Sequence, residues 1–219
     1  MKPDVTCVYY TSNREEPLFQ ERMQKTLLET LGDIPLVSVS HKSMNFGKNI
    51  CVGEMVPSSH NAFRQMQLGA IEAKTKFICV AEADTLYPRE YFEFEPKEDN
   101  LIYQVRNIWV LVALAHREHS YFKKRYAEGA IVVGREYIIK VVDSQLRGKP
   151  FWTDTTDYEK NFIGELFKCS GIDSFHNTIP VVQFKTDNNM HRKTPYIPGS
   201  GVRTLPFWGD SHELMRKYL

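Results

Sequence analysis

The sequence has few cysteines and no long hydrophobic run. Its 219 residues include four cysteines, and none of them form a C-x-x-C pair, which indicates a reduced compartment rather than a disulfide framework. The longest apolar run, residues 108–115, falls short of the roughly 20 residues that a membrane-spanning helix needs. The first residues lead directly into a strand pattern and do not resemble a signal peptide. We therefore expect a soluble, cytoplasmic protein without a transmembrane segment.

An excess of charge of one sign is also missing. The chain has 28 Lys and Arg against 27 Asp and Glu, so its formal net charge is +1 and no global field favours nucleic acid or membrane. Internal repeats and low-complexity segments are absent as well. Length and hydrophobic content are those of one packed α/β domain.

What the sequence contains is an alternation of strand and helix patterns. An amphipathic helix with Phe19, Met23, Leu27 and Leu31 on one face follows the first strand, and Ser58 or Ser59 caps a second helix. This order predicts a parallel sheet covered by helices, in which ligands bind beyond the carboxyl ends of the strands. The predicted elements are strands at 5–10, 35–40, 77–84, 101–105, 109–115, 130–133 and 179–184, and helices at 18–31, 58–74, 135–142 and 157–169, with a short helix at the C-terminus and a loop at 41–49.

Two carboxylates stand at the end of the third predicted strand. Glu82 and Asp84 are two residues apart, so in a strand they point to the same face. Two like charges on one face repel each other unless a cation lies between them. A hard divalent ion, with substrate phosphates completing its shell, is a common arrangement.

Residues 61–84 resemble glycosyltransferase family 2 and its relatives with the GT-A fold, in which a helix with an arginine leads into a strand ending in an acidic D-x-D motif. The motif here is E-A-D, and the Q-x-x-R-W motif of processive members is absent. The resemblance implies a single GT-A-like, Rossmann-like domain with a mixed, mainly parallel central sheet flanked by helices. It further implies a nucleotide-sugar-binding half (1–100), an acceptor-binding half (101–190) and a C-terminal lid or tail (191–219).

The same resemblance implies a metal-dependent transferase that uses a nucleotide-sugar donor, a UDP-sugar foremost. Mn²⁺ or Mg²⁺ would be bound directly by Asp84, and His191 would be the third protein ligand, with His212 as the competing candidate. Glu82 would be the second acidic residue of the metal site, supporting the ion less directly or contacting the ribose. The ion would make the nucleotide a better leaving group. The residues expected to bind the donor are Thr11, Asn13, Arg14, Arg64, Glu82, Ala83 and Arg192.

An inverting transferase also needs a base that takes the proton of the acceptor hydroxyl. The family places it at a helix start late in the domain, where this chain has Asp154, Asp157 and Glu159. Glu159 also completes a capping box with Thr156, so Asp157 is the first candidate and Asp154 the second.

A basic stretch with interleaved aromatics, residues 116–125, suits a polyanionic acceptor such as DNA, or is a solvated helix face. The acceptor could therefore be a glycan or a hydroxylated base in DNA. The alternatives are a nucleotidyltransferase, against which the glycine-free loop after the first strand counts, and a non-catalytic nucleotide- or glycan-binding module. The oligomeric state stays open.

Overall fold

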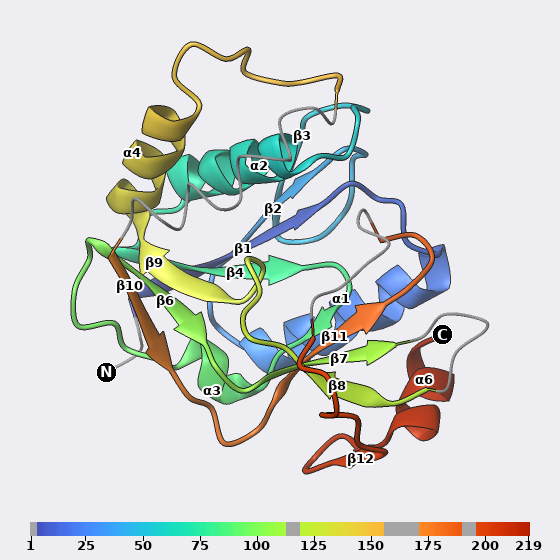
Figure 1. Cartoon of the computed structure of the whole chain (residues 1–219). Helices are drawn as coiled ribbons and strands as arrows, with labels where there is room; N and C mark the ends of the chain where they lie inside the picture. Colours follow the sequence, from blue (N-terminus) through green and yellow to red (C-terminus); the bar gives the residue numbers. More distant parts are fainter. Residues whose placement is uncertain (1–3, 113–118, 156–170, 190–195) are drawn as a thin grey trace.

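The computed structural model describes residues 4–112, 119–155, 171–189 and 196–219, and within these residues seven strands form the main sheet (Figure 1). Strand β9 runs antiparallel to both of its neighbours, β4 and β6, and every other pair in the sheet is parallel. The sheet order is β10 (Gly171–Phe175), β6 (Leu101–Val105), β9 (Ile131–Gly134), β4 (Phe77–Glu82), β1 (Val5–Thr11), β2 (Leu36–Ser40) and β3 (Lys48–Cys51).

Helices cover both faces of this sheet, as Figure 1 shows. Helices α2 (Ser59–Glu72) and α4 (Arg135–Gln145) pack on one face. Helices α1 (Pro17–Leu31) and α3 (Arg89–Phe92) lie on the other. The expected mixed, mainly parallel α/β domain flanked by helices is therefore confirmed.

A second, smaller sheet packs against the far end of α1. Its order is β5 (Thr85–Leu86), β11 (Val181–Lys185), β7 (Ile108–Val112) and β8 (Tyr121–Lys123). Helix α6 (Ser211–Tyr218) and the hairpin β12 (Thr204–Leu205) and β13 (Gly209–Asp210) complete this side. Because β5 follows β4 after a short turn, the second sheet places β11 next to the end of β4.

The apolar stripe of α1 serves two separate cores. Leu27 and Leu31 belong to the core under the main sheet, whereas Phe19 and Met23 belong to the core of the second sheet. All four predicted stripe residues are buried. Burial of this face therefore fixes both sheets on one helix.

Several predicted elements need correction. The loop predicted at 41–49 contains the start of β3, and β10 was not expected, because both are edge strands with largely exposed side chains and no apolar run. The basic stretch forms β8 rather than a helix face, and its Lys124 is only 7% exposed, so this lysine is unavailable to a polyanion. The helix predicted at 157–169 lies outside the described residues, as do His116 and Arg117.

The carboxyl ends of three parallel strands meet at one edge. Thr11 of β1 is in register with Ser40 of β2, and Tyr10 is in register with Glu82 of β4. The loop after β1 and the acidic motif therefore lie at the same edge, as the alternation of strands and helices predicts. None of the described helices is long and apolar enough to cross a membrane.

Candidate functional site

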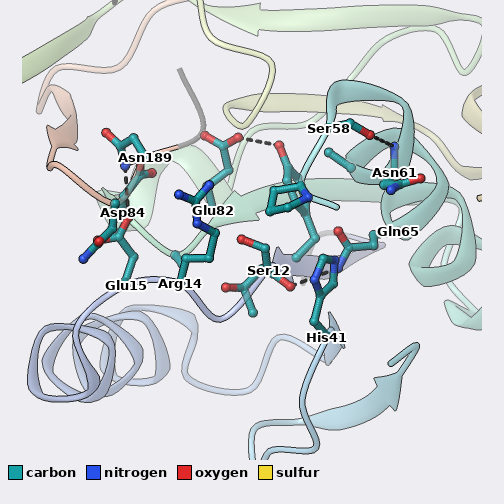
Figure 2. Close-up of a pocket in the computed structure, with 16 residues that line it drawn as sticks. Ser12, Arg14, Glu15, His41, Ser58, Asn61, Gln65, Glu82, Asp84 and Asn189 are labelled. Atoms are coloured by element: carbon teal, nitrogen blue, oxygen red, sulfur yellow. Dashed lines mark hydrogen bonds between the residues drawn. The ribbon is translucent and has the colours of Figure 1, made fainter. Parts of the chain in front are cut away.

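A cleft opens at this edge and encloses about 630 Å³ of empty space, including open solvent. Figure 2 shows that Glu15 and Asp84 lie at one end of the cleft together with Asn189, whereas the uncharged side chains of Ser58 and Gln65 lie with His41 at the other. The lining side chains come from the loop after β1, the end of β2, the start of α2, the end of β4 and the turn after β11. They are Tyr10, Thr11, Ser12, Arg14, Glu15, His41, Pro57, Ser58, Asn61, Ala62, Gln65, Glu82, Ala83, Asp84, Asn188 and Asn189.

Glu82 and Asp84 converge, although not by the alternation expected in a strand. Strand β4 ends at Glu82, and Asp84 lies in the turn before β5. The side-chain amide of Gln183 on β11 joins them, since its Nε2 is 3.1 Å from Glu82 Oε2 and 3.4 Å from Asp84 Oδ1. Tyr10 donates a further hydrogen bond to Glu82 Oε1. The two carboxylates are thus held together by amide and phenol donors.

A third carboxylate, Glu15, joins the pair through Asn189. The Asn189 Nδ2 atom donates to Asp84 Oδ2 at 2.9 Å and to Glu15 Oε1 at 3.0 Å. The Thr186 hydroxyl also donates to Glu15, 2.9 Å from Oε2. One segment, β11 and the turn after it, therefore supplies donors to carboxylates from two other segments.

Crowding and burial perturb all three acids. Burial, followed by the negative charge of Asp84, raises the pKa of Glu82 to about 8 and that of Glu15 to about 7. Burial also raises the pKa of Asp84, against the opposing effect of its hydrogen bonds and of Lys124 and Lys185. The acidic end of the cleft therefore holds more negative charge than its surroundings stabilise, and a cation would offset that charge.

Lys124 and Lys185 lie behind the carboxylates. Both are buried, and Lys124 Nζ donates to Gln183 Oε1, which fixes the amide with its NH₂ toward the acids. Burial lowers the pKa of Lys185, against the effect of Asp84. These two lysines thus place positive charge on the interior side of the acidic end, not on its solvent side.

Gly129 is packed directly on Glu82. A Cβ at position 129 would lie 2.0 Å from Glu82 Cδ, and no side chain fits there. The Gly129 carbonyl accepts a hydrogen bond of 2.5 Å from the Tyr87 hydroxyl, which in turn accepts one from the Glu82 backbone N–H. The glycine is needed here for close approach rather than for an unusual φ.

The predicted donor-binding residues separate into two groups. Thr11, Arg14 and Ala83 line the cleft with Glu82. Asn13 does not; at φ 55° its Oδ1 accepts from the Lys42 backbone N–H at 2.9 Å, so it fastens the loop after β1 to the one after β2.

Arg64 is likewise turned away from the acids. Its guanidinium donates to Gln67 Oε1 at 2.7 Å, approaches Asp143 Oδ1 at 3.3 Å and lies over the Phe151 ring. It is 6% exposed and joins α2 to α4. A contact between Arg64 and the acidic pair is therefore absent from the described structure.

Other predicted residues fall outside the described ranges or away from the cleft. Asp157, Glu159, His191 and Arg192 lie outside the described residues. Asp154 is exposed and adjoins Thr153, whose backbone N–H and C=O both bond to the side chain of Asn61 in the cleft wall. These roles stay predictions.

The competing metal candidate, His212, sits elsewhere. It belongs to the first turn of α6, where it contacts Arg203 and packs on His119, and it does not line the cleft. Among the described residues, no group of three or more His, Cys, Asp and Glu side chains is arranged to hold a metal ion. A cation at Asp84 and Glu82 would take further oxygen ligands from substrate phosphates, as Mg²⁺ commonly does.

Sequence reasoning missed Glu15, His41, Gln183 and Asn189. Glu15 directly follows Thr11–Arg14, the loop after the first strand, and its acidic side chain at that sheet edge is a usable signal. Gln183 and Asn189 carry no motif, and only the pairing of β11 with β5 brings them to β4.

Comparisons with known proteins show the fold. The structure is similar to that of the inositol-1-phosphate CTP transferase from T. maritima, with a TM-score of 0.54, 12% identity and coverage of 100% of this chain and 97% of that one. It is also similar to a protein from Bacillus anthracis described as a glucose-1-phosphate thymidylyltransferase, with a TM-score of 0.50, 10% identity and coverage of 82% and 89%. No family model matches the sequence, and no curated protein matches it.

Proposed function

We propose that this chain is a nucleotide-dependent transferase that moves a sugar from a nucleotide-sugar donor to an acceptor hydroxyl. The observation that carries the proposal is the cleft itself. It lies beyond the carboxyl ends of parallel strands, and Glu82, Asp84 and Glu15 form its charged end. This is where α/β sheets bind nucleotides.

The charged end suits a diphosphate that arrives with a divalent cation. Carboxylate oxygens are the ligands that Mg²⁺ and Mn²⁺ prefer, and Mg²⁺ is often bound by one or two carboxylates together with substrate phosphates. Asp84 and Glu82 would be those carboxylates, and Arg14 lines the cleft beside them. When bound, the cation would offset the charge that develops on the departing nucleotide.

The acceptor proton requires a base near the same cleft. Asp154, Asp157 and Glu159 remain the candidates. The loop that carries Asp154 is anchored to the cleft wall, because Thr153 and Asn61 share bonds of 2.8 and 2.9 Å. The acceptor is proposed to be a glycan or a hydroxylated base in DNA, and the attack would follow an inverting course.

A second candidate, nucleotidyl transfer, is favoured by the solved structures with this fold. Both of the similar structures above are described as proteins that transfer a nucleotide to a sugar or cyclitol phosphate. The sequence counts against nucleotidyl transfer, because the loop between β1 and α1 (residues 12–16) contains no glycine that would let its backbone wrap around a triphosphate.

One assay separates the two reactions. The chain is incubated with Mn²⁺ or Mg²⁺ and one of two sets of substrates. The first set is a panel of nucleotide sugars together with a glycan acceptor or DNA that contains hydroxylated bases, and the second is nucleoside triphosphates with sugar 1-phosphates. Sugar transfer releases a nucleoside diphosphate, whereas nucleotidyl transfer releases pyrophosphate. We expect diphosphate release that EDTA abolishes. Pyrophosphate release alone would establish the second candidate, and nucleotide binding without turnover of either panel would indicate a binding module.

A further inference from the structure

An aromatic side chain projects from a strained turn far from the cleft. The hairpin of β12 and β13 turns at Pro206, Phe207 and Trp208, and Figure 1 shows it at the edge of the molecule, below β8. The Trp208 backbone N–H donates to the Pro206 carbonyl at 2.8 Å, and the φ of Phe207 between them is 69°. A bond between residues i and i+2 around a positive φ belongs to the rare, strained form of the γ-turn. Phe207 is nevertheless 72% exposed, the highest value among the large hydrophobic residues that the structure describes.

The fold gains little from a phenylalanine at this position. The Phe207 ring meets the Trp208 ring edge-on, with centroids 4.8 Å apart, and most of its surface lies in solvent. A glycine would adopt the same φ without strain. Other residues hold the turn, because Trp208 Nε1 donates to the Pro180 carbonyl at 2.7 Å and Arg203 pairs with Asp210 across the hairpin. A bulky apolar residue that costs backbone strain and adds little packing indicates a role outside the chain.

Further apolar side chains are exposed in the segment that leads to the hairpin. Residues 196–202 lie beside β8, because the Ile197 backbone N–H donates to the Lys123 carbonyl at 2.8 Å. Tyr196, Ile197 and Val202 are each 36–37% exposed. Together with the tip of the hairpin, this segment gathers apolar surface at one edge of the second sheet, whereas single exposed apolar residues elsewhere need no explanation.

Basic side chains lie at the same end of the second sheet. Lys123 Nζ donates to Asn107 Oδ1 at 3.1 Å, and the Asn107 carbonyl accepts from the residue after Pro180, to which the hairpin is bonded. Arg106 precedes Asn107, and its guanidinium lies 3.5 Å from the Arg125 carbonyl oxygen. Both arginines are exposed, and neither forms an ion pair within the described residues. The apolar edge therefore borders a cluster of positive charge.

We propose that this edge of the second sheet docks onto membranes that contain anionic lipids. Phe207 and the apolar segment beside β8 enter the headgroup layer, as aromatic side chains at membrane surfaces do, while Arg106 and Arg125 meet the lipid phosphates. A second copy of the chain fits this edge poorly, because a symmetric contact brings the same cations together. The charge is local, since the whole chain has a formal net charge of +1. Phe207, Arg106 and Arg125 do not line the cleft, so the proposal is independent of the reaction.

The first test leaves the protein unchanged. The full chain is sedimented with vesicles of phosphatidylcholine alone and with vesicles of phosphatidylcholine mixed with phosphatidylglycerol. We expect it to sediment with the anionic vesicles and to be released from them by rising salt, because surface charges are then screened. Equal sedimentation with both kinds of vesicle, or with neither, overturns the proposal.

The second test assigns vesicle binding to the strained turn. Phe207→Gly removes the ring and relieves the φ of 69°, so we expect an unchanged or higher melting temperature together with an affinity for anionic vesicles that is about tenfold lower. Arg125→Gln should lower the same affinity about fivefold. The matched control is Ile71→Ala, at an exposed apolar position on α2, which should bind as the unsubstituted chain does.

Two results with Phe207→Gly contradict the proposal. An unchanged affinity for anionic vesicles shows that the tip does not enter the membrane. A clearly lower melting temperature shows that the ring stabilises the fold and is not reserved for an outside contact. Light scattering without vesicles adds a third readout, because a dimer that Phe207→Gly dissociates would assign this edge to a second copy of the chain and overturn the membrane assignment.

Discussion

The side-chain amide of Gln183 bridges Glu82 and Asp84: the Gln183 Nε2 atom lies 3.1 Å from Glu82 Oε2 and 3.4 Å from Asp84 Oδ1. Two neighbouring carboxylates would otherwise face each other across a half-buried space. The amide supplies donors but no charge, so it joins the acids without neutralising them, and their pKa values stay raised. The acidic end is thus organised before any cation arrives.

Lys124 is expected to hold that bridge in its active orientation. In Lys124→Met, Gln183 loses the donor to its Oε1 and its amide becomes free to turn over. We predict a fall in kcat/KM of about tenfold, the order expected for one hydrogen bond to a charged group. Lys123→Met, at the next and half-buried position, is the control. Unchanged kinetics in Lys124→Met would show that Gln183 keeps its orientation without this donor.

Gly129→Ala tests how tightly the Glu82 carboxylate is positioned. The new Cβ overlaps Glu82 Cδ, so the side chain must leave its place, and we predict both a lower melting temperature and a loss of transfer. In a double variant that also carries Glu82→Ala, the Glu82 side chain is gone and the new Cβ at position 129 no longer overlaps it. The double variant should therefore cost less stability than the two single effects added together. Additive melting-temperature changes would show that the two residues are not in contact.

The strand and helix patterns predicted the centre of the fold because burial produces them. Strands β1 and β4 are continuous apolar runs buried on both faces, and the stripes of α1 and α2 have the helical period. Edge strands lack that signal: β3 reads Lys-Asn-Ile-Cys, and β10 is mostly exposed. Their pairing depends on the neighbouring strand rather than on their own composition.

The site could be predicted only in part, for a related reason. Glu82 and Asp84 stand beside a recognisable strand, so their place at the sheet edge followed from local pattern. Gln183 and Asn189 meet them across about a hundred residues. Their amide side chains have no distinctive spacing, and only the register of β11 beside β5 determines that contact.

Asp84→Asn should separate stability from activity. Burial raises the pKa of Asp84, so the ionised form is unfavourable in the fold, and removing the charge should leave the melting temperature at pH 8 unchanged or higher. Transfer should fall about 100-fold or more if the carboxylate binds the catalytic cation. Asp99→Asn, outside the cleft lining, is the control. Full activity of Asp84→Asn would contradict the proposal that Asp84 binds a catalytic cation.

Glu15 should make the cation-free protein less stable as the pH rises. Its pKa is about 7 in the fold against 4.5 ordinarily, because of burial and then Asp84. Between those values the folded chain retains a proton that the unfolded chain has released, so the free energy of unfolding falls with rising pH. Glu82, at about 8, extends the fall to that pH.

Glu15→Gln removes the contribution of Glu15, and we expect a flatter dependence of melting temperature on pH between about 4.5 and 7. The measurement is thermal unfolding with EDTA present, because a bound cation would favour the ionised acids. Glu21→Gln, on the exposed face of α1, should keep the full slope. If Glu15→Gln and the unsubstituted chain lose stability in parallel over this range, Glu15 does not hold a proton in the fold and the acidic end is less crowded than its geometry indicates.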